Sequence, residues 1–186
     1  MNFEPIVEHG LLRESVQRFF ERELPEGRIR DMDRARRIPR SLWKRFAAMS
    51  WMGLSVPAEF GGSGADVATA AVFCEELARR FPSLATDWLL VSMTARVLRE
   101  FASPAQKAEL LPKLAAGDFL MAFGMSEPDG GTDVLALKTR ARLKAASGWC
   151  GGRSSTRRLR TTPTRFWSFV ALSPSKTSVR AACRSS

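Results

Sequence analysis

The sequence predicts an α+β protein, in which an all-helical N-terminal domain of five or six helices precedes the first strands of a truncated β-domain. Apolar residues recur at helical spacing from residue 4 to residue 117, and the pattern changes near residue 120 to apolar runs of strand length. An irregular basic tail follows. We therefore expect a helical domain over 1–117, the start of a β-domain over 118–144 and a tail over 145–186.

The first expected helix covers residues 4–23, where apolar side chains form one stripe. A second is expected to begin after Pro39, since proline precedes or opens helices well, and to run to Met49. Residues 53–66 contain Pro57 and several glycines, which break the helical pattern and predict a loop.

Asp66 is expected to cap the next helix, because a short polar acceptor satisfies free amides at a helix N-terminus. That helix should end before Pro82, and another is expected over 85–101. Ser103 followed by a proline predicts the start of the last helix, which Gly117 closes.

The strands are expected after this helix. Residues 119–127 form a continuous apolar run, 128–133 contain proline and two glycines, and 134–143 alternate apolar and polar residues in places. This order predicts a strand, a turn and a second strand.

Single residues outside the strands receive structural interpretations. His9, the only histidine, is expected to be a partly exposed polar residue, and Met93 to fill the core. Trp43, Trp51 and Trp88 are expected to pack in the helical core. Four arginines near two aspartates predict a solvated connector between helices: Arg34, Arg36, Arg37 and Arg40.

The net charge of +10 at first suggests a nucleic-acid partner. However, eight of the 29 Lys and Arg residues lie from Ala145 onward, whereas all 19 acidic residues lie before it. Most of the net positive charge therefore lies in the tail, and residues 1–144 are close to neutral. We keep nucleic-acid binding by the tail as an alternative and do not expect it, although arginines there alternate with aromatic residues.

The cysteine count and the hydropathy exclude several classes. Cys74, Cys150 and Cys183 are odd in number and far apart, so they predict neither a disulfide framework nor a metal site. No apolar run is long enough for a membrane span, and the N-terminus lacks the features of a signal peptide. We expect a cytoplasmic protein that binds no metal.

The candidate chemistry lies in residues 123–134, with the sequence FGMSEPDGGTDV. The glycine pair lets the main chain approach phosphate oxygens, because no Cβ intervenes. Successive amides in such a turn form an anion-binding nest. Taken alone, the segment fits a plain strand–turn–strand better than a binding site.

These residues closely resemble the signature of the acyl-CoA dehydrogenases, a family of flavoproteins. Two further segments, 53–66 and 103–118, resemble motifs of the same family in the same order, so the resemblance covers about residues 1–144. It implies a partial FAD site, with Phe123, Met125 and Ser126 facing the isoalloxazine. It also implies that Gly131 and Thr132 contact the pyrophosphate, and that Thr132 contacts the acyl-CoA as well.

The resemblance also implies an activity and partners. Members of the family remove the α proton of an acyl-CoA thioester with a carboxylate base and pass the β hydride to FAD. That base lies in a C-terminal domain, and no residue here matches its motif, so we expect no catalytic residue in this chain. The family implies an acyl-CoA substrate, an electron-transfer acceptor and a homo-oligomer.

The sequence departs from the family after Trp149. Acidic residues vanish while arginine, serine and threonine rise together, which is typical of GC-rich DNA read in a shifted frame. We expect a frameshift there, and a purified chain that is poorly soluble, without bound flavin and without turnover. The chain is then a truncated oxidoreductase or an inactive remnant of one.

Overall fold

The computed structural model describes residues 6–124, 127, 140–144, 147–151 and 165–168, with side chains for 6–121 and 127. The helices among them are α1 (Val7–Glu23), α2 (Glu26–Ala35), α3 (Arg40–Ala48), the short 3-10 helix η1 (Ala58–Phe60), α4 (Val67–Arg80), α5 (Pro82–Phe101) and α6 (Pro104–Ala115). The strands are β1 (Met121–Gly124), β2 (Arg140–Lys144), β3 (Ser147–Gly151) and β4 (Arg165–Ser168).

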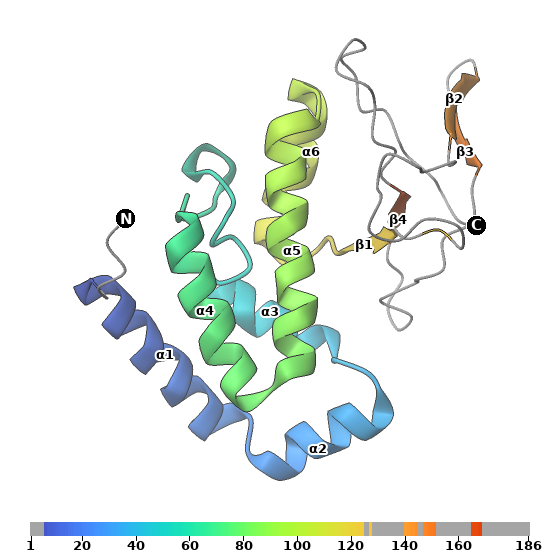
Figure 1. Ribbon diagram of the computed structural model, residues 1–186. Helices are drawn as coiled ribbons and strands as arrows, with labels where there is room; N and C mark the ends of the chain where they lie inside the picture. The colour runs from blue at the N-terminus through green and yellow to red at the C-terminus, as the bar shows by residue number, and fades with distance from the viewer. Residues whose placement is uncertain (1–5, 125–126, 128–139, 145–146, 152–164, 169–186) are drawn as a thin grey trace.

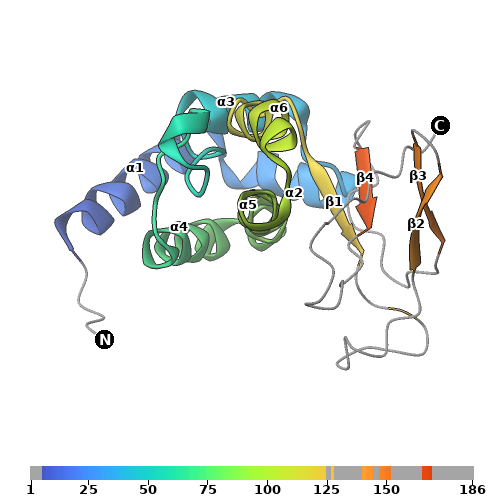
Figure 2. The ribbon, with the colours of Figure 1, turned by 90° about the horizontal axis from the view of Figure 1, so that it is seen from above.

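The helices form a two-layered domain. Helices α4 and α5 make an antiparallel hairpin that turns at Phe81, and α1 packs on α4 while α6 packs on α5 (Figure 1). Seen from above, α3 and α6 lie on the opposite side of the domain from this hairpin (Figure 2). Phe81 is fully buried and anchors the turn.

The expected helix starts are confirmed at two caps. Asp66 accepts a hydrogen bond from the Thr69 amide at 2.8 Å, and Ser103 forms a reciprocal capping box with Gln106. Helix α5 begins at Pro82 rather than at residue 85, since proline is accommodated at a first helical position.

Helix α2 was not expected from the sequence, and the connector prediction is therefore wrong for Arg34. That arginine lies inside α2, whereas Arg36 and Arg37 follow the helix and Arg40 opens α3. The helix carries only two inward apolar side chains, Ile29 and Met32, among charged residues. Such a short apolar stripe leaves little periodic signal.

An aromatic cluster forms the centre of the helical domain. Trp51 contacts Phe19, Phe46 and Phe73 at ring-centroid distances of 5.1 to 5.2 Å. Trp43, Trp51 and Trp88 are all buried, as expected. The prediction for Met93 is wrong, because its side chain is 38% exposed.

The prediction for His9 is also wrong, because its side chain is buried rather than partly exposed. Its Nε2 lies 3.2 Å from the hydroxyl of Thr69 on α4. The burial arises because α1 packs directly along α4.

The loop between α3 and α4 closes tightly on itself. The amides of Gly64 and Ala65 donate to the carbonyls of Val56 and Leu54, both at 2.8 Å. A Cβ on Gly62 would lie 2.0 Å from the Val56 oxygen, so no side chain fits there without moving the backbone. The expected loop over 53–66 is confirmed.

The strands are described by their pairing alone. Strand β1 pairs in parallel with β4, and β2 pairs antiparallel with β3. Strand β1 lies within the expected strand 119–127. Of the expected strand 134–143, residues 134–139 lie outside the described residues. The division into segments 1–117, 118–144 and 145–186 stays a prediction.

Candidate functional site

A cavity of about 470 Å³ lies between α4, α5 and the end of the loop that precedes α4. Its volume is in the range of small-molecule sites. The α4 wall is made of small side chains, and the α5 wall of larger ones, including Trp88, Leu89 and Met93. Leu89 is 44% exposed, so the α5 wall is open to solvent. The cavity can therefore accept a chain-like apolar group.

Small side chains on α4 create this space. They lie on one face of the helix and are Ala70, Ala71, Cys74 and Ala78. Sequence reasoning missed the cavity, because alanine is an ordinary helix former and carries no functional signal of its own. The regular spacing of these small residues is the only pattern that could have indicated a groove.

Two hydrogen bonds are made by residues that line the cavity. The side chains of Ser55, in the loop, and Ser92, on α5, hydrogen bond to each other at 2.7 Å. Trp88 donates its indole N–H to the carbonyl of Trp51 at 3.0 Å. These two bonds join the loop to α5 and hold the cavity wall in place.

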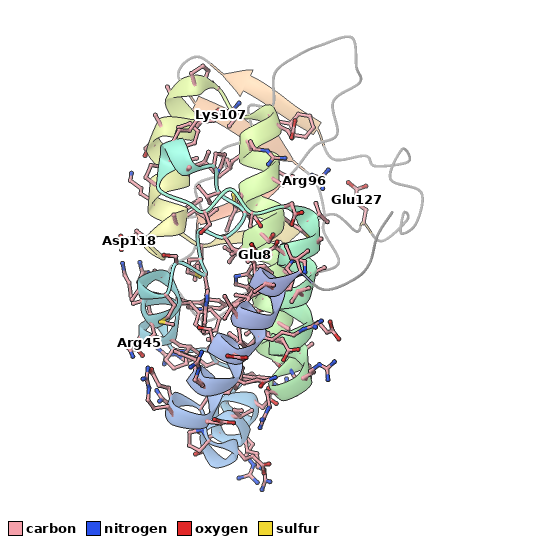
Figure 3. All side chains as sticks on the ribbon, turned by 90° about the vertical axis from the view of Figure 1, so that its left-hand side faces the viewer. Glu8, Arg45, Arg96, Lys107, Asp118 and Glu127 are labelled. Atoms are coloured by element: carbon pink, nitrogen blue, oxygen red, sulfur yellow. The ribbon has the colours of Figure 1, made fainter. Side chains whose placement is uncertain are left out.

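Charged residues complete the lining. Arg96 and Arg99 on α5 are exposed, and Glu75 on α4 pairs with Arg79 at 2.8 Å. Figure 3 shows the Arg96 side chain extending outward from its helix. Arg99 pairs with Glu100 at 3.1 Å. An apolar cavity with Arg96 in its lining suits a ligand that joins an aliphatic part to an anionic part.

Cys74 is the only free cysteine among the residues whose side chains are described, and it lines this cavity. Burial raises the pKa of its thiol, because the thiolate loses solvation there. The thiol is therefore mostly protonated at neutral pH. It is a poor nucleophile at neutral pH, and its slow chemical modification can serve as a probe of the cavity.

A buried carboxylate fixes α1 on α4. Glu76 is only 4% exposed, and its Oε1 lies 3.3 Å from Nε of Arg13 as an ion pair. Gln17 donates to the other oxygen of Glu76 at 3.4 Å. This cluster keeps α4, and with it the small-residue wall, in register with α1.

The expected flavin residues are mostly not described. Met125, Ser126, Gly131 and Thr132 lie outside the described residues, and Phe123 is described only as a backbone position of β1 that pairs with Trp167. Whether these residues come together stays a prediction. The structure places β1 directly after α6, at the edge of the helical domain (Figure 1).

The described residues include neither a metal-binding cluster nor a membrane-spanning helix. No group of three or more His, Cys, Asp or Glu side chains among them could hold a metal ion. None of the helices described above is both long and apolar enough to cross a membrane.

Residues 7–118 match the family model described as "Acyl-CoA dehydrogenase, N-terminal domain". A protein of Bacillus subtilis named "Probable acyl-CoA dehydrogenase" is 32% identical over 142 residues, which cover 76% of this chain and 37% of the relative. This chain thus spans about a third of the length of the curated relatives that it matches.

Solved structures give the same fold. An acyl-CoA dehydrogenase from Geobacillus kaustophilus superposes with a TM-score of 0.78 at 24% identity, covering 88% of this chain and 43% of that one. A glutaryl-CoA dehydrogenase from Mycobacterium smegmatis, solved in complex with FADH2, superposes with a TM-score of 0.72 at 23% identity, over 80% of this chain and 38% of that one. The fold of the helical domain is therefore shared with these chains.

Proposed function

The chain belongs to the acyl-CoA dehydrogenase family, and from this membership we propose that it is the N-terminal part of an FAD-dependent oxidoreductase acting on an acyl-CoA thioester. The cavity between α4 and α5 supports this proposal most directly. Its apolar lining suits the acyl chain, and Arg96 suits an anionic group such as a CoA phosphate.

We further propose that residues 118–144 begin the β-domain and carry the flavin contacts. Phe123, Met125 and Ser126 would face the isoalloxazine, whereas Gly131 and Thr132 would contact the pyrophosphate and Thr132 also the acyl-CoA. FAD, when bound, supplies the acceptor for the hydride. These residues would orient the ring and hold the phosphates with main-chain amides.

The cavity assignment is tested by protection of Cys74. Iodoacetamide modification of this thiol is followed by peptide mass spectrometry, with octanoyl-CoA added below its micelle concentration. We expect octanoyl-CoA to slow the modification severalfold, and free CoA or octanoate to slow it less. Equal rates with and without octanoyl-CoA would contradict the assignment.

Two matched variants sharpen this test. Ala71→Phe places a ring in the cavity lining, whereas Ala68→Phe places the same ring on the exposed side of α4 outside the lining. Both alanines are exposed, so neither substitution crowds the core. Protection by octanoyl-CoA should disappear in the first variant and persist in the second.

The flavin assignment is tested by titration of FAD against its own fluorescence. We expect weak saturable binding, lost on gel filtration, that Ser126→Ala weakens and that Ser63→Ala, in the exposed loop before α4, leaves unchanged. With FAD, an acyl-CoA and an artificial electron acceptor, we expect no turnover by this chain. Turnover would contradict the expectation that no residue of 1–186 serves as the catalytic base.

We propose that the reading frame shifts after Trp149, which translation of the DNA in the other two frames tests directly. A homo-oligomer and an electron-transfer partner are proposed for a protein of the relatives' full length. Nucleic-acid binding through the tail is the alternative; it requires an affinity that falls steeply with salt and is lost when residues 145–186 are deleted.

A further inference from the structure

Helix α3 holds the stretch of chain that leads from α6 into β1. Lys44 donates from its Nζ to the carbonyl of Ala116 at 3.0 Å and to the carboxylate of Asp118 at 2.5 Å. Arg40 donates to the carbonyl of Asp118 at 2.8 Å. Two cations from one helix thus make three hydrogen bonds to two residues of another segment, Ala116 and Asp118, more than 70 positions away in sequence.

These contacts occupy the C-terminal end of α6. The last carbonyls of a helix have no intrahelical partner, and cations stabilise the negative end of the helix dipole. Lys44 therefore donates to the carbonyl of Ala116, the C-cap residue of α6, whereas Arg40 binds the carbonyl of Asp118 beyond the helix. Together they also lower the pKa of Asp118, chiefly through the hydrogen bond from Lys44.

Gly117 lets the two segments approach closely. Its φ is +65°, and a Cβ there would lie 3.0 Å from the Trp43 carbonyl of α3. Immediately after it, Phe119, Leu120 and Met121 are buried at no more than 7% exposure. Figure 3 shows Asp118 on the same side of the molecule as Arg45 of α3. The chain that leads into β1 is therefore held against α3, while β1 itself contacts α5.

We propose that Lys44 and Arg40 are positioning residues that fix the origin of β1, and through it the placement of the flavin-binding loop that follows. The inference rests on the proposed function for the role of the loop, whereas the contacts themselves do not depend on it. Only a few residues separate Asp118 from Phe123, so a shift at the strand origin is carried along the strand to the loop.

The test compares Lys44→Met with Lys113→Met in the full chain. Lys113 is a matched control: it is 53% exposed against 45% for Lys44, and it pairs with Glu109 at 3.0 Å inside α6. Hydrogen exchange of residues 119–124 is measured for both variants, together with FAD affinity and the midpoint of thermal unfolding.

In Lys44→Met we expect exchange at residues 119–124 to accelerate roughly two- to fivefold and FAD affinity to fall by a similar factor, as for loss of a solvent-exposed ion pair. Both variants should unfold at similar temperatures, and Lys44→Arg should restore both measurements. These results separate a positioning effect from a general loss of stability.

Three results overturn the proposal in distinguishable ways. Exchange no faster in Lys44→Met than in Lys113→Met shows that Lys44 does not fix the strand. Faster exchange with unchanged FAD affinity shows that the effect does not reach the loop. Absence of saturable FAD binding by the unsubstituted chain contradicts the flavin assignment of the loop itself, whatever the exchange rates show.

Discussion

The indole N–H of Trp88 donates to the backbone carbonyl of Trp51, 3.0 Å away, inside the helical domain. Both side chains are buried, and Phe73 lies between them, with ring-centroid distances of 5.2 Å to Trp51 and 4.6 Å to Trp88. The bond joins α5 to the residue that opens the loop before α4. It therefore supports the core and the cavity wall at the same time.

Trp88→Phe should destabilise the protein by about 1–3 kcal/mol more than Trp51→Phe, because a buried carbonyl loses its donor only in the first variant. The second variant makes the same change of ring size and keeps the Trp51 carbonyl in place. Urea unfolding followed by far-UV circular dichroism measures both. Equal losses would show that packing rather than the hydrogen bond dominates.

Glu76 and Glu75 form a matched pair on α4. Both contact Arg13 and Arg79, but the Glu76 side chain is 4% exposed and that of Glu75 is 49% exposed. Glu76→Gln should destabilise the protein by roughly 2 kcal/mol, because the buried carboxylate that Arg13 and Gln17 contact loses its charge. Glu75→Gln should change stability little, as is usual for surface pairs. Similar unfolding midpoints for the two variants would contradict this view of the α1–α4 contact.

Asp66 should make the domain sensitive to acid. Hydrogen bonds from Thr69, above all from its amide, lower the pKa of the Asp66 carboxyl. Because the folded pKa lies below the unfolded one, the stabilisation is complete above the unfolded value near 4 and is lost as the pH falls through the lower folded value.

Two substitutions separate the cap from its charge. Asp66→Ala should lower the melting temperature by roughly 4 °C at pH 7, because the Thr69 amide loses its acceptor. Asp66→Asn should keep most of the cap while reducing the loss of stability below pH 4. A steep acid transition that is unchanged in Asp66→Asn would assign it to other carboxylates, such as Asp118 beside Lys44.

Cys74 should be modified slowly by iodoacetamide at neutral pH. Burial raises the pKa of its thiol. The reactive thiolate is therefore scarce until the pH exceeds the pKa of an ordinary thiol. The modification rate, measured by peptide mass spectrometry, should continue to rise above pH 9. A plateau near pH 8 would contradict the burial argument, and a Cys74→Ser variant verifies the peptide assignment.

The sequence predicted features that depend on neighbouring residues. The caps at Asp66 and Ser103 were predictable, because each satisfies amides only three residues away. Most of the aromatic core was predictable from helical spacing, although Trp51 lies between two helices. Helix α2 was not, since two apolar positions make too short a stripe. The cavity was not either, because its walls come from two helices whose pairing no local pattern specifies.

The candidate site divides in the same way. The flavin loop was predicted from a signature of contiguous residues and stays a prediction, since Ser126, Gly131 and Thr132 lie outside the described residues. The contacts of Lys44 with Asp118 could not be predicted, because the two residues are 74 positions apart. A lysine on an exposed helix face carries no sign of its partner.

Gly62 has a consequence for how the chain can vary. It is neither in the core nor in the cavity lining, yet the carbonyls of Val56 and Gly53 occupy the space in which any Cβ would stand. A saturation library covering residues 53–66 should therefore accept many replacements at the exposed Ser63 and none at Gly62. In such a library, Gly62 would tolerate replacement as poorly as a buried tryptophan does, although Gly62→Ala adds only one methyl group.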